Sequence, residues 1–293
     1  MMNVSIGINP IGWSNDDMQY VGADISLHTC LAEASAAGYA GVELGHKFPR
    51  DPDVLRPALE ENKLSLVSGW YSGRLLQRDS DDEIAAMQDH VRLLKAMGSD
   101  VLIFAEVSGC IHSGIDKRLS QRPRIPAGRW PTFCRRLDEV ANACAAEGLK
   151  LCFHHHMGTV VQSREDIEIM MQSTSAHMHL LLDTGHAFFA GADPLELAGQ
   201  YADRIAHVHC KDIRQDVLRR MKNRDCSFPE AVLAGVFTVP GDGCIDYEGV
   251  FSALGKTDYC GWAVVEAEQD PSVAPPSLYA KLGYENLERL TAN

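Results

Sequence analysis

The sequence lacks the features of disulfide-bonded and membrane-spanning proteins. Its nine cysteines are scattered and none forms a C-x-x-C pair, so we expect free thiols in a reducing compartment. No stretch reaches the roughly 18 uncharged apolar residues that a transmembrane helix requires. The first residues contain no basic segment followed by an apolar one, so no signal peptide is predicted. These absences predict a cytoplasmic protein with no membrane partner.

Basic residues are scarce relative to acidic ones. The chain has 27 lysine and arginine residues against 40 aspartate and glutamate residues, which gives a formal net charge of −13. Nucleic acids and anionic membranes are bound through basic patches, so this balance argues against both as partners. It is compatible with a small neutral or cationic substrate.

Short β-branched runs alternate with segments of helical spacing along the chain. Eight strand–helix units in 293 residues predict a single-domain (β/α)8 TIM barrel spanning residues 1–293. A doubly wound open sheet is the alternative, but it would usually carry a glycine-rich turn after its first strand, and Asn9-Pro10-Ile11-Gly12 is no such turn. The predicted strands cover residues 4–8, 41–44, 64–68, 101–105, 150–153, 179–183, 205–209 and 261–266.

Helical spacing is clearest in two segments, residues 84–97 and 133–144, which carry apolar side chains at i, i+3, i+4 and i+7. Ser163, with Asp166 three residues later, predicts the start of another helix. Two connections, at about 107–130 and 212–247, are longer than a barrel needs. Such loops in a compact domain are usually functional.

Polar side chains gather where the predicted strands end, and in a parallel barrel the catalytic residues lie at those carboxyl ends. Converging imidazoles and carboxylates are typical of Mn²⁺, Co²⁺, Fe²⁺ or Zn²⁺ sites, whereas Mg²⁺ prefers an all-oxygen shell. The sequence therefore predicts a transition-metal site. The strand ends carry Glu43, Glu106, His154, His155, His156, Asp183, His186, His209, Lys211, Asp212, Glu266 and Glu268.

Three consecutive histidines, His154, His155 and His156, follow the fifth strand. Because side chains alternate along a strand, His154 and His156 should point to one side and His155 to the other. For any single histidine, a hydrogen-bonded core position is the simpler interpretation. Only the strand ends taken together indicate a metal site.

Three segments resemble motifs of the xylose-isomerase-like barrel superfamily, which includes sugar isomerases, keto-sugar epimerases and DNA-repair endonucleases. They are L-L-D-T-G-H at 181–186, I-A-H-V-H-C-K-D at 205–212 and G-W-A-V-V-E at 261–266. The resemblance implies that Asp183, His209 and Glu266 bind a divalent metal. It also implies that His154 occupies the position of the usual fourth ligand, a glutamate.

The chain resembles the inosose dehydratase family over essentially its whole length. The resemblance is most specific in the histidine at position 154, in I-G-I-N-P-I-G-W-S-N at 6–15 and in F-H-H-H-M-G-T at 153–159. The resemblance implies a hydro-lyase of inositol catabolism that converts 2-keto-myo-inositol (scyllo-inosose) into a trihydroxycyclohexane-1,2-dione and water. A neutral imidazole in place of a carboxylate favours Mn²⁺ or Co²⁺, with Zn²⁺ or Fe²⁺ as alternatives. Glutathione as a further cofactor and a homo-oligomer are compatible with this resemblance.

Loss of water beside a ketone requires a base for the α-proton, an acid for the departing hydroxyl and stabilisation of the enolate. We expect Glu43 and His156 to transfer protons and Lys211 to polarise or orient an oxygen. Among substrate-binding residues we expect Trp13, Trp70 and His186. The alternatives are a salt bridge at the barrel rim for Glu43 and core positions for the tryptophans.

Other functions on the same barrel stay open. A metal-dependent keto-sugar isomerase or epimerase would share every ligand and the enediolate intermediate. A DNA-repair endonuclease would need a basic surface, against which the charge argues. A polyol-binding sensor without catalysis would not need a complete ligand set.

Overall fold

The computed structural model describes residues 3–291, and eight parallel strands form a closed barrel in the order β1-β10-β7-β6-β5-β4-β3-β2. This confirms the predicted (β/α)8 architecture. All eight predicted strands are present, and β3 continues beyond residue 68 to Gly73. The strands are β1 (Val4–Ile8), β2 (Gly41–Leu44), β3 (Ser65–Gly73), β4 (Val101–Glu106), β5 (Lys150–His154), β6 (Met178–Asp183), β7 (Ile205–Cys210) and β10 (Gly261–Val265).

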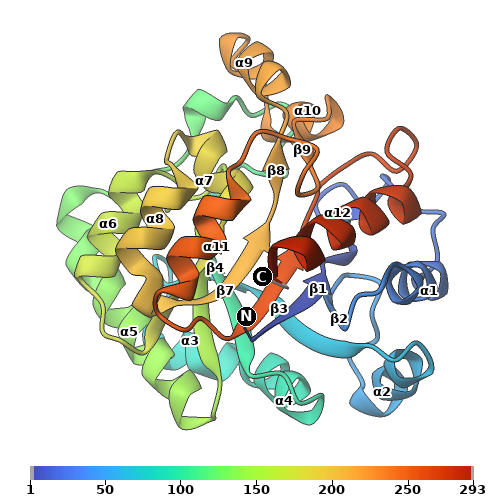
Figure 1. Ribbon diagram of the computed structural model, residues 1–293. Coiled ribbons are helices and arrows are strands. Elements are labelled where there is room, and N and C mark those ends of the chain that lie inside the picture. The colour runs from blue at the N-terminus through green and yellow to red at the C-terminus, as the bar shows by residue number, and fades with distance from the viewer. Residues whose placement is uncertain (1–2, 292–293) are drawn as a thin grey trace.

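Helices surround the barrel (Figure 1). The predicted helix over 84–97 is divided at Met87, although hydrogen bonds from Met87 N to Glu83 O and from Val91 N to Met87 O continue its spacing across the break. None of the described helices is long and apolar enough to cross a membrane. The helices are α1 (Leu27–Ala37), α2 (Pro52–Glu61), α3 (Ser80–Ala86), α4 (Gln88–Ala96), α5 (Trp130–Ala146), α6 (Arg164–Gln172), α7 (Thr184–Ala190), α8 (Pro194–Tyr201), α11 (Tyr247–Gly255) and α12 (Pro276–Thr291).

The long connection after β7 folds into elements of its own. It contains the short antiparallel strands β8 (Asp212–Ile213) and β9 (Phe237–Thr238) and the helices α9 (Gln215–Asn223) and α10 (Phe228–Leu233). In Figure 1 this insertion stands out from the ring of helices. Its apolar side chains form a second buried cluster, which also includes Met18 from the loop after β1.

The other long connection, residues 107–129, contains only two 3-10 turns and is tied to the insertion. Ser120 donates from its backbone N and its Oγ to the carboxylate of Asp225, at 2.9 and 2.6 Å. Nearby, His112 Nε2 lies 3.3 Å from Asp17 Oδ1, in the loop after β1. Three loops at the carboxyl ends of the strands are thereby connected to one another.

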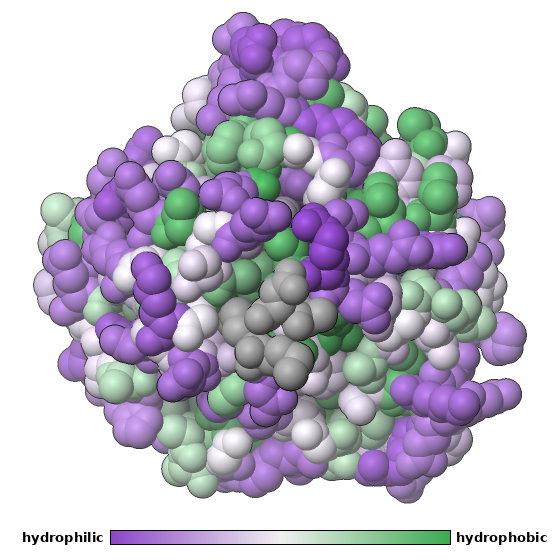
Figure 2. Space-filling view, viewed as in Figure 1, coloured by the Kyte–Doolittle hydropathy of each residue, from purple (hydrophilic) through white to green (hydrophobic). Residues whose placement is uncertain are grey.

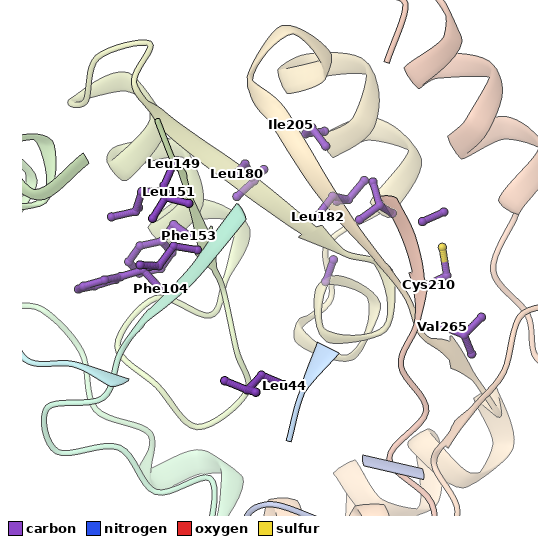
Figure 3. Packing of buried hydrophobic residues seen from close by; sticks show 14 of the residues in the cluster. Leu44, Phe104, Leu149, Leu151, Phe153, Leu180, Leu182, Ile205, Cys210 and Val265 are labelled. Atoms are coloured by element: carbon purple, nitrogen blue, oxygen red, sulfur yellow. The ribbon is translucent and has the colours of Figure 1, made fainter. Parts of the chain in front are cut away.

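Strict alternation of side chains separates the packing core from the barrel interior. On β6, Leu180 and Leu182 point outward to the helices, whereas Leu181 packs inside the barrel. Figure 3 shows outward side chains of neighbouring strands lying together, such as Phe104 and Phe153, whose rings are 6.0 Å apart. Burying this surface is the main stabilising contribution to the barrel. The inward positions at the strand ends are left for polar groups.

Candidate metal centre and active site

Four side chains meet inside the barrel at the carboxyl ends of β5, β6, β7 and β10. They are His154, Asp183, His209 and Glu266, and one potential ligand atom from each lies within 4.8 Å of the others. Asp183 Oδ2 lies 3.6 Å from His154 Nε2 and 3.5 Å from His209 Nδ1. Donors in a tetrahedral shell with bonds of about 2.1 Å would be roughly 3.4 Å apart. The spacing therefore suits a divalent transition metal.

The same four atoms are buried and have no hydrogen-bond partner: His154 Nε2, Asp183 Oδ2, His209 Nδ1 and Glu266 Oε2. The approach of His209 Nδ1 to Glu266 Oε2, 2.6 Å, lacks hydrogen-bond geometry. Buried polar atoms without a hydrogen bond are costly, and a convergent set of them fits a bound cation. Two imidazole nitrogens and two carboxylate oxygens fit Mn²⁺, Fe²⁺, Co²⁺ or Zn²⁺.

Local hydrogen bonds orient two of these ligands. His154 donates from Nδ1 to the carbonyl of His155 at 3.0 Å, which leaves Nε2 free to bind a metal. Asp183 caps helix α7 by accepting from the backbone N of His186 with Oδ1 at 2.7 Å, which leaves Oδ2 free. Each side chain therefore uses one polar atom for structure and presents the other to the centre.

Glu43 lies behind His209 rather than open to a substrate. Its Oε1 accepts from His207 Nε2 at 2.7 Å, from His209 Nε2 at 3.1 Å and from Ser68 Oγ at 2.6 Å, and its Oε2 accepts from Asn9 Nδ2 at 2.7 Å. Burial opposes the charge of Glu43, but the two histidines hold its pKa well below the usual range. A bond from His209 Nε2–H to Glu43 leaves Nδ1 of His209 unprotonated, as a metal ligand must be.

His209 is surrounded by negative charge. Burial alone would lower its pKa, but Glu266 and Glu43 raise it well above the ordinary value. The carboxylates thus favour positive charge at this point, which either a proton or a metal ion can provide. A bound cation would take the place of that proton.

Lys211 places a buried ammonium group beside the four ligands. Its Nζ lies 2.7 Å from Glu268 Oε1, 3.2 Å from Glu266 Oε2 and 3.7 Å from Asp183 Oδ2. Burial disfavours its charge, yet these carboxylates raise its pKa above the usual value. Lys211 is therefore a cation and a hydrogen-bond donor at neutral pH. His186 Nε2 lies 3.0 Å from the same Nζ.

His156 lies next to the centre and is held in one tautomer. Its Nδ1 donates to the carbonyl of Met157 at 2.8 Å, so Nε2 carries the lone pair. Burial and then the charges of His112, His154 and Lys211 keep its pKa well below the ordinary value. A neutral imidazole with a free lone pair can accept a proton.

The structure brings one of the two predicted tryptophans to this region. Trp70 presents its ring to His154 and His156, with centroids 5.4 and 5.7 Å apart. Trp13 does not reach the cluster: its indole Nε1 donates to Glu33 on α1 at 2.6 Å, on the outer side of β1. The expectation that Trp13 borders the substrate is not supported by this position.

The structure adds two residues to the cluster: Glu268, which the sequence analysis placed at a strand end without giving it a role, and Phe228, which it did not select. Glu268 holds Lys211, and burial raises its pKa to about 7 in spite of that cation. Phe228, from the insertion, lies 5.3 Å from the ring of His156 and 5.6 Å from that of His186. No local pattern distinguishes Phe228 from a core phenylalanine.

Solved structures share the fold of this chain at low sequence identity. The IOLI protein with a binding zinc atom covers 99% of this chain and 98% of its own, with a TM-score of 0.71 and 16% identity. The probable 3-DHS dehydratase AsbF from Bacillus anthracis covers 97% and 98%, with a TM-score of 0.68 and 16% identity. At such identities the likeness shows the fold alone.

Curated relatives are much more similar in sequence. The rhizopine catabolism protein MocC of Rhizobium meliloti is 47% identical over 100% of this chain and 90% of its own. The inosose dehydratase of Geobacillus thermodenitrificans is 40% identical over 94% of each chain, and that of Clostridium botulinum is 39% identical over 97% and 96%. The family described as xylose isomerase-like TIM barrel matches residues 31–290. The chain therefore belongs to the xylose isomerase-like TIM barrel family and, within it, to the group formed by the inosose dehydratases and MocC.

Proposed function

We propose that this protein is an inosose dehydratase, a metal-dependent hydro-lyase that converts 2-keto-myo-inositol into a trihydroxycyclohexane-1,2-dione and water. The observation that carries the proposal is the convergence of four buried ligand atoms without a hydrogen-bond partner at the carboxyl end of the barrel. Relatives named inosose dehydratase at 37–40% identity support the substrate. The reaction fits a site that combines a metal set with proton donors and acceptors.

His154, Asp183, His209 and Glu266 are the proposed metal ligands. Two imidazoles and two carboxylates favour Mn²⁺ or Co²⁺ in our proposal, with Zn²⁺ or Fe²⁺ as alternatives. A bound divalent cation supplies Lewis-acid stabilisation of the enolate that forms when the α-proton leaves. The net charge of the four side chains, two negative carboxylates and two neutral imidazoles, balances that of the cation.

His156 is the proposed base for the α-proton. Its Nδ1 is committed to the carbonyl of Met157, so the lone pair of Nε2 faces away from the backbone. Lys211 is proposed to hold its proton toward the departing β-hydroxyl, since Glu268 fixes its ammonium group at 2.7 Å. His186 and Trp70 would border the substrate. Loss of water then leaves an enol that tautomerises to the dione.

Glu43 is proposed to position His209 instead of transferring a proton. Its Oε1 accepts from His207, His209 and Ser68, its Oε2 accepts from Asn9, and the side chain is buried, so both oxygens are engaged with protein groups. Carboxylates in this arrangement orient a metal-bound histidine and raise its basicity. This differs from the sequence-based expectation for Glu43.

The test is to incubate the purified protein with 2-keto-myo-inositol and to follow the near-ultraviolet absorbance of the dione. We expect activity that disappears after chelation and returns with Mn²⁺ or Co²⁺. The variant His156→Gln should retain metal and lose at least about a hundredfold in turnover, whereas Asp183→Asn should lose the metal. No product with any metal, in the presence or absence of glutathione, would contradict the substrate assignment.

The sequence-based expectations of a single domain over residues 1–293, a cytoplasmic location and a homo-oligomer belong to the proposal as well. Limited proteolysis, cell fractionation and light scattering test them in turn. One resistant core, recovery in the soluble cytoplasmic fraction and a mass above 32.2 kDa are the expected results.

A role in rhizopine catabolism is a second candidate, favoured by the 47% identity to MocC. Keto-sugar epimerisation is a further alternative because it needs the same ligands and proton transfers. Rhizopine and keto-sugars assayed beside 2-keto-myo-inositol, at equal metal loading, would separate the three. A higher kcat/KM for either rival would replace the dehydratase proposal.

A further inference from the structure

A surface pocket of about 640 Å³ lies outside the barrel, beneath α9. Its volume falls within the range of roughly 300–1,000 Å³ that is typical of small-molecule sites. In Figure 2 apolar residues are visible on the surface directly below the hydrophilic tip formed by α9. Residues from α7, α8, α9 and the start of α11 line the pocket.

The apolar part of the pocket wall comes from separate elements. Phe188 belongs to α7, Leu195 to α8, Leu218 to α9 and Val250 to α11, and Ile245 precedes α11. Leu218 and Val250 are buried, whereas Phe188 and Leu195 are partly exposed. The walls therefore offer a hydrophobic surface that an apolar or planar body could cover.

Two cations of α9, Arg219 and Lys222, line the same pocket. Among residues 3–291, neither has an ion pair or a hydrogen bond to a side chain, and Lys222 only faces the ring of Phe189, with Nζ 5.8 Å from its centroid. Desolvation lowers the pKa of Lys222, and no carboxylate raises it again. In a chain of net charge −13, unpaired cations beside an apolar pocket indicate charge complementarity to an anion.

The two carboxylates of the pocket are engaged elsewhere. Asp193 Oδ1 accepts from the backbone N of Leu195 at 2.8 Å, and Asp246 Oδ1 accepts from the backbone N of Gly249 at 2.9 Å. Both are helix N-caps, of α8 and α11. They hold the pocket walls in place, and among the described residues neither forms an ion pair with Arg219 or Lys222.

The pocket is connected to the candidate active site through two of its walls. Helix α7 begins directly after Asp183 and includes His186, and α9 follows Lys211 and the short strand β8. A molecule bound between α7 and α9 would fix these helices relative to each other.

From the unpaired cations over an apolar floor, we infer that this pocket binds a small organic anion, a carboxylate or phosphate carried on an apolar or planar body. The anion lies between Arg219 and Lys222, and the body covers Phe188, Leu195 and Leu218. The site is distinct from the metal centre and does not depend on the proposed reaction.

The test uses the full-length protein and the fluorescent probe 8-anilinonaphthalene-1-sulfonate, an organic anion with an aromatic body. We expect saturable binding that the double variant Arg219→Gln/Lys222→Gln weakens at least tenfold. Arg220→Gln is the matched control, because Arg220 lies on the same helix and pairs with Asp216 at 2.8 Å; it should leave probe affinity unchanged. Cys244→Trp, which fills the pocket, should abolish binding without removing a charge.

Competition identifies the chemical source of the anion. Displacement of the probe by AMP but not by benzoate would assign a phosphate, and the reverse result a carboxylate. Equal probe affinity in the wild-type protein and the double variant would overturn the inference. A second result would also overturn it: the wild-type protein binds no probe, and light scattering shows a dimer that the double variant loses. The pocket would then be an interface between copies.

Discussion

Both nitrogens of His209 face carboxylates, and this single side chain determines whether the candidate metal centre can form. Nε2 lies 3.1 Å from Glu43 Oε1, and Nδ1 lies 2.6 Å from Glu266 Oε2. Because Glu43 can only accept, it fixes the proton on Nε2 and leaves Nδ1 for the metal. Glu43 is therefore as important for metal binding at this position as His209 itself.

Glu43→Gln tests this assignment. An amide can present its NH₂ group to His209 and so favour the wrong tautomer, and we expect metal affinity to fall about 10- to 100-fold. Isothermal titration with Mn²⁺ measures the change. Glu106→Gln is the control: Glu106 is equally buried at the end of β4, but its carboxylate accepts from the backbone N of Leu75 and Ser108. Unchanged affinity with lost turnover in Glu43→Gln would instead make Glu43 the base.

At the scale of elements, the first turn of α7 lies so close to Lys211, the residue after β7, that only glycine fits at position 185. A Cβ added to Gly185 would lie 2.5 Å from Lys211 Cγ and 2.8 Å from the Lys211 carbonyl oxygen. The absence of a side chain therefore lets Lys211 pass the first turn of α7 toward the centre. In the T-G-H segment at 184–186, the glycine is therefore required for steric reasons, in addition to any chemical role of the histidine.

Gly185→Ala should therefore lower both stability and activity. Overpacking of this kind costs about 1–3 kcal/mol, and displacement of Lys211 should reduce turnover. Gly199→Ala, in the interior of α8, has open space around the added methyl group. It should be neutral or stabilising by up to about 1 kcal/mol. Urea denaturation and the dehydratase assay of both variants check the pair, and equal effects would exclude the steric argument.

Contacts between loops make a pH-dependent contribution to stability. Burial opposes the charge of His112, but Asp17 and Cys110 raise its pKa from 6.5 to about 10. A raised folded-state pKa means that the stabilisation is complete below about pH 6.5 and is lost as the pH rises through about 10. The ring of His156 lies edge to face with that of His112, 5.1 Å away, and burial keeps the pKa of His156 well below its ordinary value.

Asp17→Asn should remove this contribution. We expect the variant to be less stable than the wild-type protein by about 1 kcal/mol at pH 6, and the difference should shrink as the pH approaches 10. Urea unfolding at several pH values measures it. Asp89→Asn, at an exposed pair with Arg92, serves as control and should show no such trend. A difference that does not change with pH would contradict the charged state of His112.

At the scale of the whole molecule, metal binding and barrel closure are linked. The four proposed ligands come from the ends of four strands in the second half of the chain, so an ion bound to them would hold β5, β6, β7 and β10 together. A ligand that binds only the folded state stabilises it by mass action. Mn²⁺ at one hundred times its Kd should add about 2.7 kcal/mol to the free energy of unfolding.

Thermal unfolding with and without chelator measures this effect. The midpoint should rise with Mn²⁺ in the wild-type protein, by several degrees for a chain of this size. Asp183→Asn keeps a side chain able to cap α7 but removes a charged ligand, so its midpoint should respond weakly. An equal response of the variant would show that the ion binds elsewhere.

Much of the site could be predicted from the sequence because each barrel strand can be recognised from its own residues. Once the length and the inward face of a strand are known, the polar residue at its carboxyl end is expected at one edge of the barrel. The ligand set of His154, Asp183, His209 and Glu266 followed from the resemblance, and the structure brings these four side chains together. The surroundings of Trp13 and Glu43 could not be predicted in this way, because their hydrogen-bond partners, Glu33 and His209, are brought to them by tertiary packing.

The sequence by itself determined the number of barrel strands, their inward and outward faces and the identity of the groups at their ends. Period-two alternation and β-branched runs fix these features within a few residues. Only the tertiary structure decided which of those groups meet: Glu43 and His209 are 166 residues apart and touch because the sheet closes. The docking of Phe228 and the pocket under α9 likewise depend on how the insertion packs, and no local pattern encodes that packing.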